Sequence, residues 1–263
     1  MSSDPVGRVH ALFEALLARD GAGGSWLAAL LQAAPYGPQR LGELAASPGW
    51  LEAPLAVRTE TGRRGAFEYP AAPTRRLLRW YVNHGDELTR PPADEASPET
   101  LRLRRALLDD VPGIRARARD RAYDLLNSTI TANPAWWRFE EARTADCVLA
   151  TDRLVVVVQG REDGAPAEPA TPWFPRRSAL VRDLEAARRL ADGGKAYGVI
   201  VLSGTPTPDA DPEAVAAAVA AGAPHLDSAE QAELVGAWLG ELSWERAAQA
   251  TGVDLAAVPG WPG

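Results

Sequence analysis

The chain has 263 residues, of which 46% are hydrophobic and 24% are charged, so its composition is that of an ordinary globular protein. The formal net charge of −7 argues against a protein that coats nucleic acid nonspecifically, although a local basic groove is compatible with it. No apolar run approaches the roughly 18 residues that a membrane span needs. Cys147 is the only cysteine, which excludes an intrachain disulfide. We therefore expect a cytoplasmic protein with no membrane partner.

Residues 1–130 are predicted to form a mainly helical region. Apolar residues at helical spacing indicate a helix over about 6–20, and Ser25 is a plausible N-cap for the next helix. A short helix is expected from Leu41. Residues 54–70, PLAVRTETGRRGAFEYP, alternate between apolar and polar and contain a glycine turn, which predicts a small hairpin.

Three further helices are expected in this region, over about 74–83, 99–110 and 112–126. The last two carry seven arginines between Arg102 and Arg121. Arginines that alternate by two are spread over much of a helix surface, so a solvated face is the favoured interpretation. A patch that contacts phosphate is the alternative.

Residues 131–263 are predicted to form an α/β core with C-terminal helices, and the two regions to make one compact unit. The pattern indicates a helix at 135–142, a hairpin at 144–163, a long helix at about 176–192 and a buried strand at 196–204. The expected fold class is therefore α/β, a helix–strand–strand–helix–strand core with helical additions at both ends.

Three C-terminal helices complete the expected order. One follows Asp211, and the last follows Ser243. Between them, Ser228 and Gln231 form a predicted capping box for a helix that continues through Trp238.

The hairpin TADCVLATDRLVVVVQGRED carries polar residues at an otherwise apolar end. If its turn is centred at residues 152–153, Asp146 lies opposite Gln159 on the same face. Period-two alternation adds Arg161 to that face. The sequence thus predicts a carboxylate, an amide and a guanidinium together at the open end of a buried hairpin.

This arrangement resembles the core of the PD-(D/E)XK superfamily, the restriction-endonuclease-like nucleases. Their core is helix–strand–strand–strand–helix–strand, and an Asp on one central strand and a (D/E)-x-K on the next hold a divalent metal. By this resemblance Asp146 matches the family Asp, Gln159 its Glu and Arg161 its Lys, with Gly160 between them.

The flanking sequence is similar to that of uncharacterised bacterial members of the superfamily. Glu140 or Glu141 matches the upstream carboxylate that many members carry, and WFPRR at 173–177 matches a W-x-P-x-R helix start. PHLDSAEQAELVGAWLGELSWERA is similar to their C-terminal helices. The resemblance covers about two thirds of the chain.

The resemblance implies a DNA endonuclease site that uses Mg²⁺ or Mn²⁺. Its metal ligands would be Glu141 and Asp146, with Gln159 as a neutral ligand, and Arg161 would bind the phosphate. A second set of residues would contact the nucleic acid more weakly, namely Trp137, Arg176 and Arg177. For this set, helix packing and a solvated surface are the alternatives.

Two departures from the family pattern decide the expected activity. Mg²⁺ prefers charged oxygen ligands, and Gln159 removes one negative charge from the site. Arg161 stays protonated and cannot act as a base, although it can clamp a phosphate. Lys195 is the only lysine among 28 basic residues, so arginine in place of lysine at position 161 can reflect the composition of the whole chain. The composition does not explain glutamine in place of glutamate at position 159.

We therefore predict a nuclease-like protein of the PD-(D/E)XK type with weakened or lost metal-dependent DNA phosphodiesterase activity. The alternative is a non-catalytic module on the same fold that binds nucleic acid or a protein partner.

Overall fold

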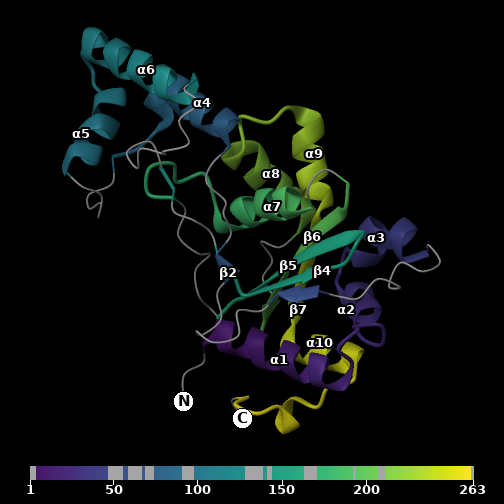
Figure 1. Cartoon of the computed structure of the whole chain (residues 1–263). Coiled ribbons are helices and arrows are strands. Elements are labelled where there is room, and N and C mark those ends of the chain that lie inside the picture. Colours follow the sequence, from purple (N-terminus) through teal and green to yellow (C-terminus); the bar gives the residue numbers. More distant parts are fainter. Residues whose placement is uncertain are drawn as a thin grey trace.

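The computed structural model describes residues 4–46, 56–58, 67–68, 74–90, 98–127, 139–140, 144–162, 171–191, 194–206 and 211–261. These residues form a mixed α/β fold in which helices cover both faces of a central sheet (Figure 1). The α/β fold class is therefore confirmed. None of the described helices is both long and apolar enough to cross a lipid bilayer.

The central sheet has five strands in the order β1-β4-β5-β6-β7. The strands are β1 (Ala56–Arg58), β4 (Cys147–Ala150), β5 (Leu154–Gly160), β6 (Ala196–Ser203) and β7 (Trp238–Ser243). Neighbours from β1 to β5 are antiparallel, whereas β5, β6 and β7 are parallel to one another. The connection from β5 to β6 accordingly runs through a helix.

The predicted register of the central hairpin is confirmed. Val148 lies opposite Val157, and the Thr151 N–H donates to the Leu154 carbonyl over 2.8 Å where the turn closes. The strands are buried on both sides, because helices pack on both faces of the sheet. The run of valines in β5 is typical of such a doubly covered strand.

The small hairpin predicted within residues 54–70 does not form as expected. Two short strands are present there, but β1 pairs with β4 at the edge of the central sheet. The other, β2 (Phe67–Glu68), pairs with β3 (Thr144–Ala145) in a separate two-stranded sheet. The alternating pattern identified strand residues, but the partner was set by the open edge of β4, which only the fold brings near.

A second correction concerns the C-terminal region, where Trp238 was expected to continue a helix. Helix α9 (Ser228–Gly236) ends before it, and Trp238 is the first residue of β7. Trp238 packs in the core on one side of the sheet and Leu239 in the core on the other. A strand can bury apolar side chains on both faces, and that burial overrides the helical spacing.

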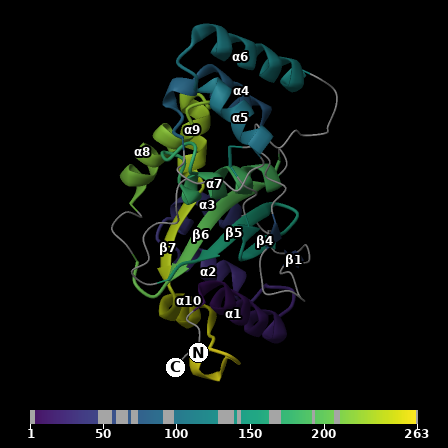
Figure 2. The ribbon, with the colours of Figure 1, turned by 90° about the vertical axis from the view of Figure 1, so that its left-hand side faces the viewer.

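Two helical layers enclose the sheet (Figure 2). One face is covered by α1 (Pro5–Arg19), α2 (Leu27–Ala33), α3 (Gly37–Ala46) and α10 (Trp244–Thr251). The other face is covered by α7 (Ala179–Leu190), α8 (Pro212–Gly222) and α9. Two short 3-10 helices are also present, Gly85–Glu87 and, after α10, Leu255–Ala257.

Two predicted caps are wrong by one residue. Helix α2 follows Trp26, which makes no side-chain cap, so Ser25 does not serve as its N-cap. The capping box of α9 consists of Asp227 and Glu230. Aspartate is as good an N-cap as serine, so the local pattern alone allowed both registers.

A third apolar cluster forms a lobe beside the sheet (Figure 1). It contains α4 (Arg75–Asn83), α5 (Pro98–Leu107) and α6 (Pro112–Asn127). Phe139, Trp173 and Phe174 fill its centre, and the Arg104 guanidinium lies 5.5 Å from the ring centroid of Trp173. Most of the helix predicted at 135–142 lies outside the described residues.

Candidate functional site

A row of polar residues crosses the sheet on the face covered by α7. Gln159 on β5 lies opposite Val201 on β6, and Val201 lies opposite Glu241 on β7. Asp146 immediately precedes β4 and extends the row on the other side of Gln159. The row lies near the carboxyl ends of the parallel strands, where ligand sites of α/β sheets usually form.

Asp146 and Gln159 come together as the hairpin register predicts. The backbone N–H of Asp146 donates to Gln159 Oε1 over 3.3 Å. The Asp146 carboxylate accepts a hydrogen bond of 2.7 Å from the backbone N–H of Gly160. Both side chains are buried, each with 7% of its surface exposed. The predicted meeting of carboxylate and amide therefore exists, inside the protein rather than on an open surface.

The other end of the Gln159 side chain reaches α7. Its Nε2 donates to Asp183 Oδ1 over 3.1 Å, and Asp183 is buried. Both polar atoms of the amide are thus engaged by the protein. An amide can make these two contacts at once because it carries a donor and an acceptor, whereas an ionised carboxylate is an acceptor only.

Arg161 forms an ion pair with Glu241. The Glu241 side chain is 1% exposed and that of Arg161 25% exposed, so the pair runs from the interior to the surface. The Arg161 N–H also continues the sheet by donating to the Leu202 carbonyl over 2.7 Å. Arg161 accordingly neutralises a buried carboxylate while keeping part of its surface in solvent.

Glu241 was not identified from the sequence, because no strand was expected between the helix through Trp238 and the helix that follows Ser243. A β-bulge between β6 and β7 explains its position. Val199 pairs with Trp238, but the next residue, Ile200, pairs with Gly240. One extra residue reverses which side chains face α7, and this turns Glu241 toward Arg161. Gly240 has a φ of 112°, a backbone conformation that favours glycine. The glycine at this position is therefore the feature of the sequence that indicates the bulge.

Gly160 occupies the variable position of the motif for a steric reason. A Cβ added to it would lie 2.6 Å from the Pro5 carbonyl oxygen at the start of α1. The backbone of α1 therefore packs directly on the strand between Gln159 and Arg161.

A separate buried cluster surrounds Arg177. Its Nε donates to Glu140 Oε2 over 2.6 Å, and its guanidinium also binds Glu185 and the Gly222 carbonyl. His225 Nε2 lies 2.9 Å from Glu185 Oε1. Burial alone would raise the pKa of Glu185, but the charge of Arg177 and the hydrogen bond from His225 outweigh it and lower this pKa to about 2.

This cluster pairs Arg177 with Glu140 and Glu185 and not with a residue of the polar row. Arg177 is buried with its donors on two carboxylates, which is the arrangement of a structural ion-pair network rather than of an exposed phosphate contact. Arg176, by contrast, is at the surface, where it binds Glu87 and lies 5.0 Å from the ring centroid of Phe174. Glu141 and Trp137 lie outside the described residues.

The described residues do not form a metal centre. No group of three or more histidine, cysteine, aspartate or glutamate side chains among them is placed to hold a metal ion. At the polar row, the Asp146 carboxylate accepts from Gly160 and the Gln159 carbonyl from Asp146, so two of the three expected ligands are already engaged by protein donors. The third, Glu141, lies outside the described residues.

A comparison with known proteins finds no matching family model, no matching curated protein and no matching solved structure. Function has to be argued from the geometry of the site.

Proposed function

We propose that this chain is a restriction-endonuclease-like protein of the PD-(D/E)XK type that has lost metal-dependent DNA cleavage and acts as a DNA-binding module. The elements α1, β1, β4, β5, α7 and β6 support the ancestry, because they follow the helix–strand–strand–strand–helix–strand order of that core. Further elements are inserted among them: α2 and α3 before β1, and β2, α4, α5, α6 and β3 between β1 and β4. The antiparallel pairing of β1, β4 and β5 and the parallel pairing of β6 give the mixed sheet that the proposal requires.

The single observation that carries the loss of cleavage is the double engagement of Gln159. Its amide bridges the Asp146 backbone and the Asp183 carboxylate, so it holds the hairpin to α7. A second motif position is also used internally, since Arg161 neutralises Glu241. The residues that would bind metal and phosphate in an active site thus stabilise the fold here.

A plasmid-nicking assay tests the loss of cleavage. We expect supercoiled plasmid to stay intact with the wild-type protein in Mg²⁺ or Mn²⁺. A double variant, Gln159→Glu with Arg161→Lys, restores the family motif and is expected to bring back nicking that a further Asp146→Ala abolishes. Nicking by the wild-type protein that disappears in Asp146→Ala would overturn the proposal and establish a variant endonuclease.

Duplex binding is tested separately by fluorescence anisotropy over a series of salt concentrations. Contacts between arginine and phosphate release counterions, so we expect the affinity to fall steeply as salt rises. Arg176 lies at the surface with its side chain 49% exposed, and Arg176→Gln should reduce the salt slope by about one phosphate contact. If no salt-sensitive binding is found, the DNA partner is excluded and a protein partner becomes the remaining interpretation.

A further inference from the structure

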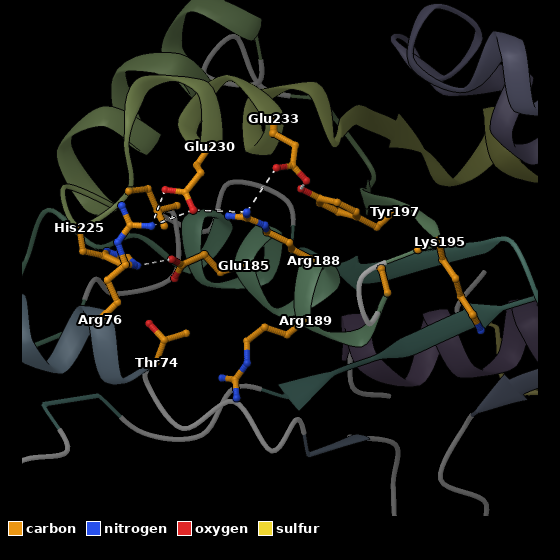
Figure 3. Close-up of a pocket in the computed structure, with 13 residues that line it drawn as sticks. Thr74, Arg76, Glu185, Arg188, Arg189, Lys195, Tyr197, His225, Glu230 and Glu233 are labelled. Atoms are coloured by element: carbon orange, nitrogen blue, oxygen red, sulfur yellow. Dashed lines mark hydrogen bonds and ion pairs between the residues drawn. The ribbon is translucent and has the colours of Figure 1, made fainter. Parts of the chain in front are cut away.

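A cavity of about 740 Å³ lies where α4, α7, α9 and the start of β6 meet (Figure 3). Tyr197, the second residue of β6, lines the cavity, whereas the polar row crosses β6 at Val201, farther along the same strand. The cavity is therefore distinct from the polar row, although it shares Glu185 and His225 with the cluster around Arg177. Its volume is within the range of about 300–1,000 Å³ that small-molecule sites occupy.

Cationic side chains reach this cavity from different elements. Arg76 comes from α4 and Arg188 and Arg189 from α7, while α9 contributes Glu230 and Glu233. Lys195 also lines the cavity, but its Nζ donates to the Thr151 carbonyl over 2.8 Å. The three arginines outnumber the two carboxylates of α9. The third lining carboxylate, Glu185, is already neutralised by the buried Arg177.

The guanidinium groups retain donors. One nitrogen of Arg76 binds both oxygens of Glu230, over 2.6 and 2.8 Å. Arg188 lies between the two carboxylates of α9, at 3.5 Å from Glu230 and 3.4 Å from Glu233, as Figure 3 shows. It donates no hydrogen bond to a described residue, although a guanidinium carries five N–H donors. Arg76 and Arg188 therefore keep N–H donors beyond those that face the carboxylates of α9, and a bound anion can accept from them.

His225 lines the same wall beside Glu185. Its side chain is 1% exposed, Nε2 lies 2.9 Å from Glu185 Oε1, and both ring nitrogens are shielded from solvent. His225 therefore shapes the wall, and the arginines provide the donors that a ligand can reach.

We propose that this cavity binds a small phosphate monoester. The arginine donors converge from α4 and α7, and a phosphate presents oxygens in several directions, whereas a carboxylate presents two in one plane. Leu226, Ala191 and the Tyr197 ring provide apolar surface for the organic part. These contacts select the organic part only by its size and apolar surface, so the phosphate is the group that the cavity recognises.

Calorimetric titration of the full chain tests this inference, with adenosine 5′-monophosphate, adenosine and inorganic phosphate as probes. We expect saturable binding of the monophosphate, weaker competing binding of inorganic phosphate and none of adenosine. Arg188→Gln and Arg76→Gln should each weaken monophosphate binding about tenfold or more. Arg246→Gln, at an exposed position on α10, is the matched control and should leave it unchanged.

Binding of adenosine equal to that of the monophosphate, or binding unaffected by Arg188→Gln, would overturn the inference, as would the absence of heat with both phosphate probes. A 5′-phosphorylated tetranucleotide distinguishes two sources of the phosphate. If it competes with adenosine 5′-monophosphate, the ligand is the end of a nucleic-acid strand; if it does not compete, the ligand is a free metabolite. These outcomes are independent of plasmid nicking, because neither arginine contributes to the polar row.

Discussion

Gln159→Glu tests whether the amide of Gln159 is a structural bridge or a disabled metal ligand. The amide Nε2 donates to Asp183 Oδ1 over 3.1 Å, so an ionised carboxylate at this position would face another carboxylate at that distance. At an effective dielectric constant of about 20 such a pair repels by roughly 5 kcal/mol. The introduced carboxyl would instead take up a proton and donate it to Asp183, which keeps the hydrogen bond.

The free-energy cost of protonating this carboxyl determines how much stability Gln159→Glu loses. A carboxyl with an ordinary pKa of about 4.3 costs roughly 3.7 kcal/mol to protonate at pH 7 and roughly 1 kcal/mol at pH 5. Because the folded-state pKa is raised above the unfolded value, the variant loses stability as pH rises. We therefore expect Gln159→Glu to lower the free energy of unfolding by about 3–4 kcal/mol at pH 7 and by about 1 kcal/mol at pH 5.

Denaturant unfolding at the two pH values measures this difference relative to wild type. Gln249→Glu makes the same chemical change at an exposed position on α10 and should have little effect at either pH. A loss below about 1 kcal/mol at pH 7, with no dependence on pH, would refute the idea that the amide is buried against Asp183. Restoration of the variant's stability by Mg²⁺ or Mn²⁺ would indicate that the carboxylates then converge on a cation.

Three further predictions concern other parts of the fold. The lowered pKa of Glu185 stabilises the protein above pH 4.5, and this contribution is lost as pH falls toward about 2, so the destabilisation by Glu185→Gln, measured by denaturant unfolding, should shrink over that window. Gly240→Ala combines a positive φ with a Cβ that would lie 2.7 Å from Pro35, and thermal unfolding should show a loss of about 2–4 kcal/mol. Burial raises the pKa of the Cys147 thiol, so native protein should resist iodoacetamide that labels unfolded protein quickly; rapid native labelling, followed by mass spectrometry, would contradict this.

The sequence determined the parts of the fold that depend on neighbouring residues. The hairpin register followed from alternation and a turn, and it correctly brought Asp146 beside Gln159. The start of α8 was also readable, because Asp211 caps the helix directly before Pro212. Such signals are local, because capping and alternation involve residues a few positions apart.

Only the tertiary structure decided what these side chains contact. Asp183 and Glu241 are far from the hairpin in sequence, and they reach it because α7 crosses the sheet and a bulge rotates β7. Trp238 shows the same limit, since a short apolar run is helical or extended according to what covers it. Burial on two faces is a property of packing, and no spacing along the chain specifies which partner will provide it.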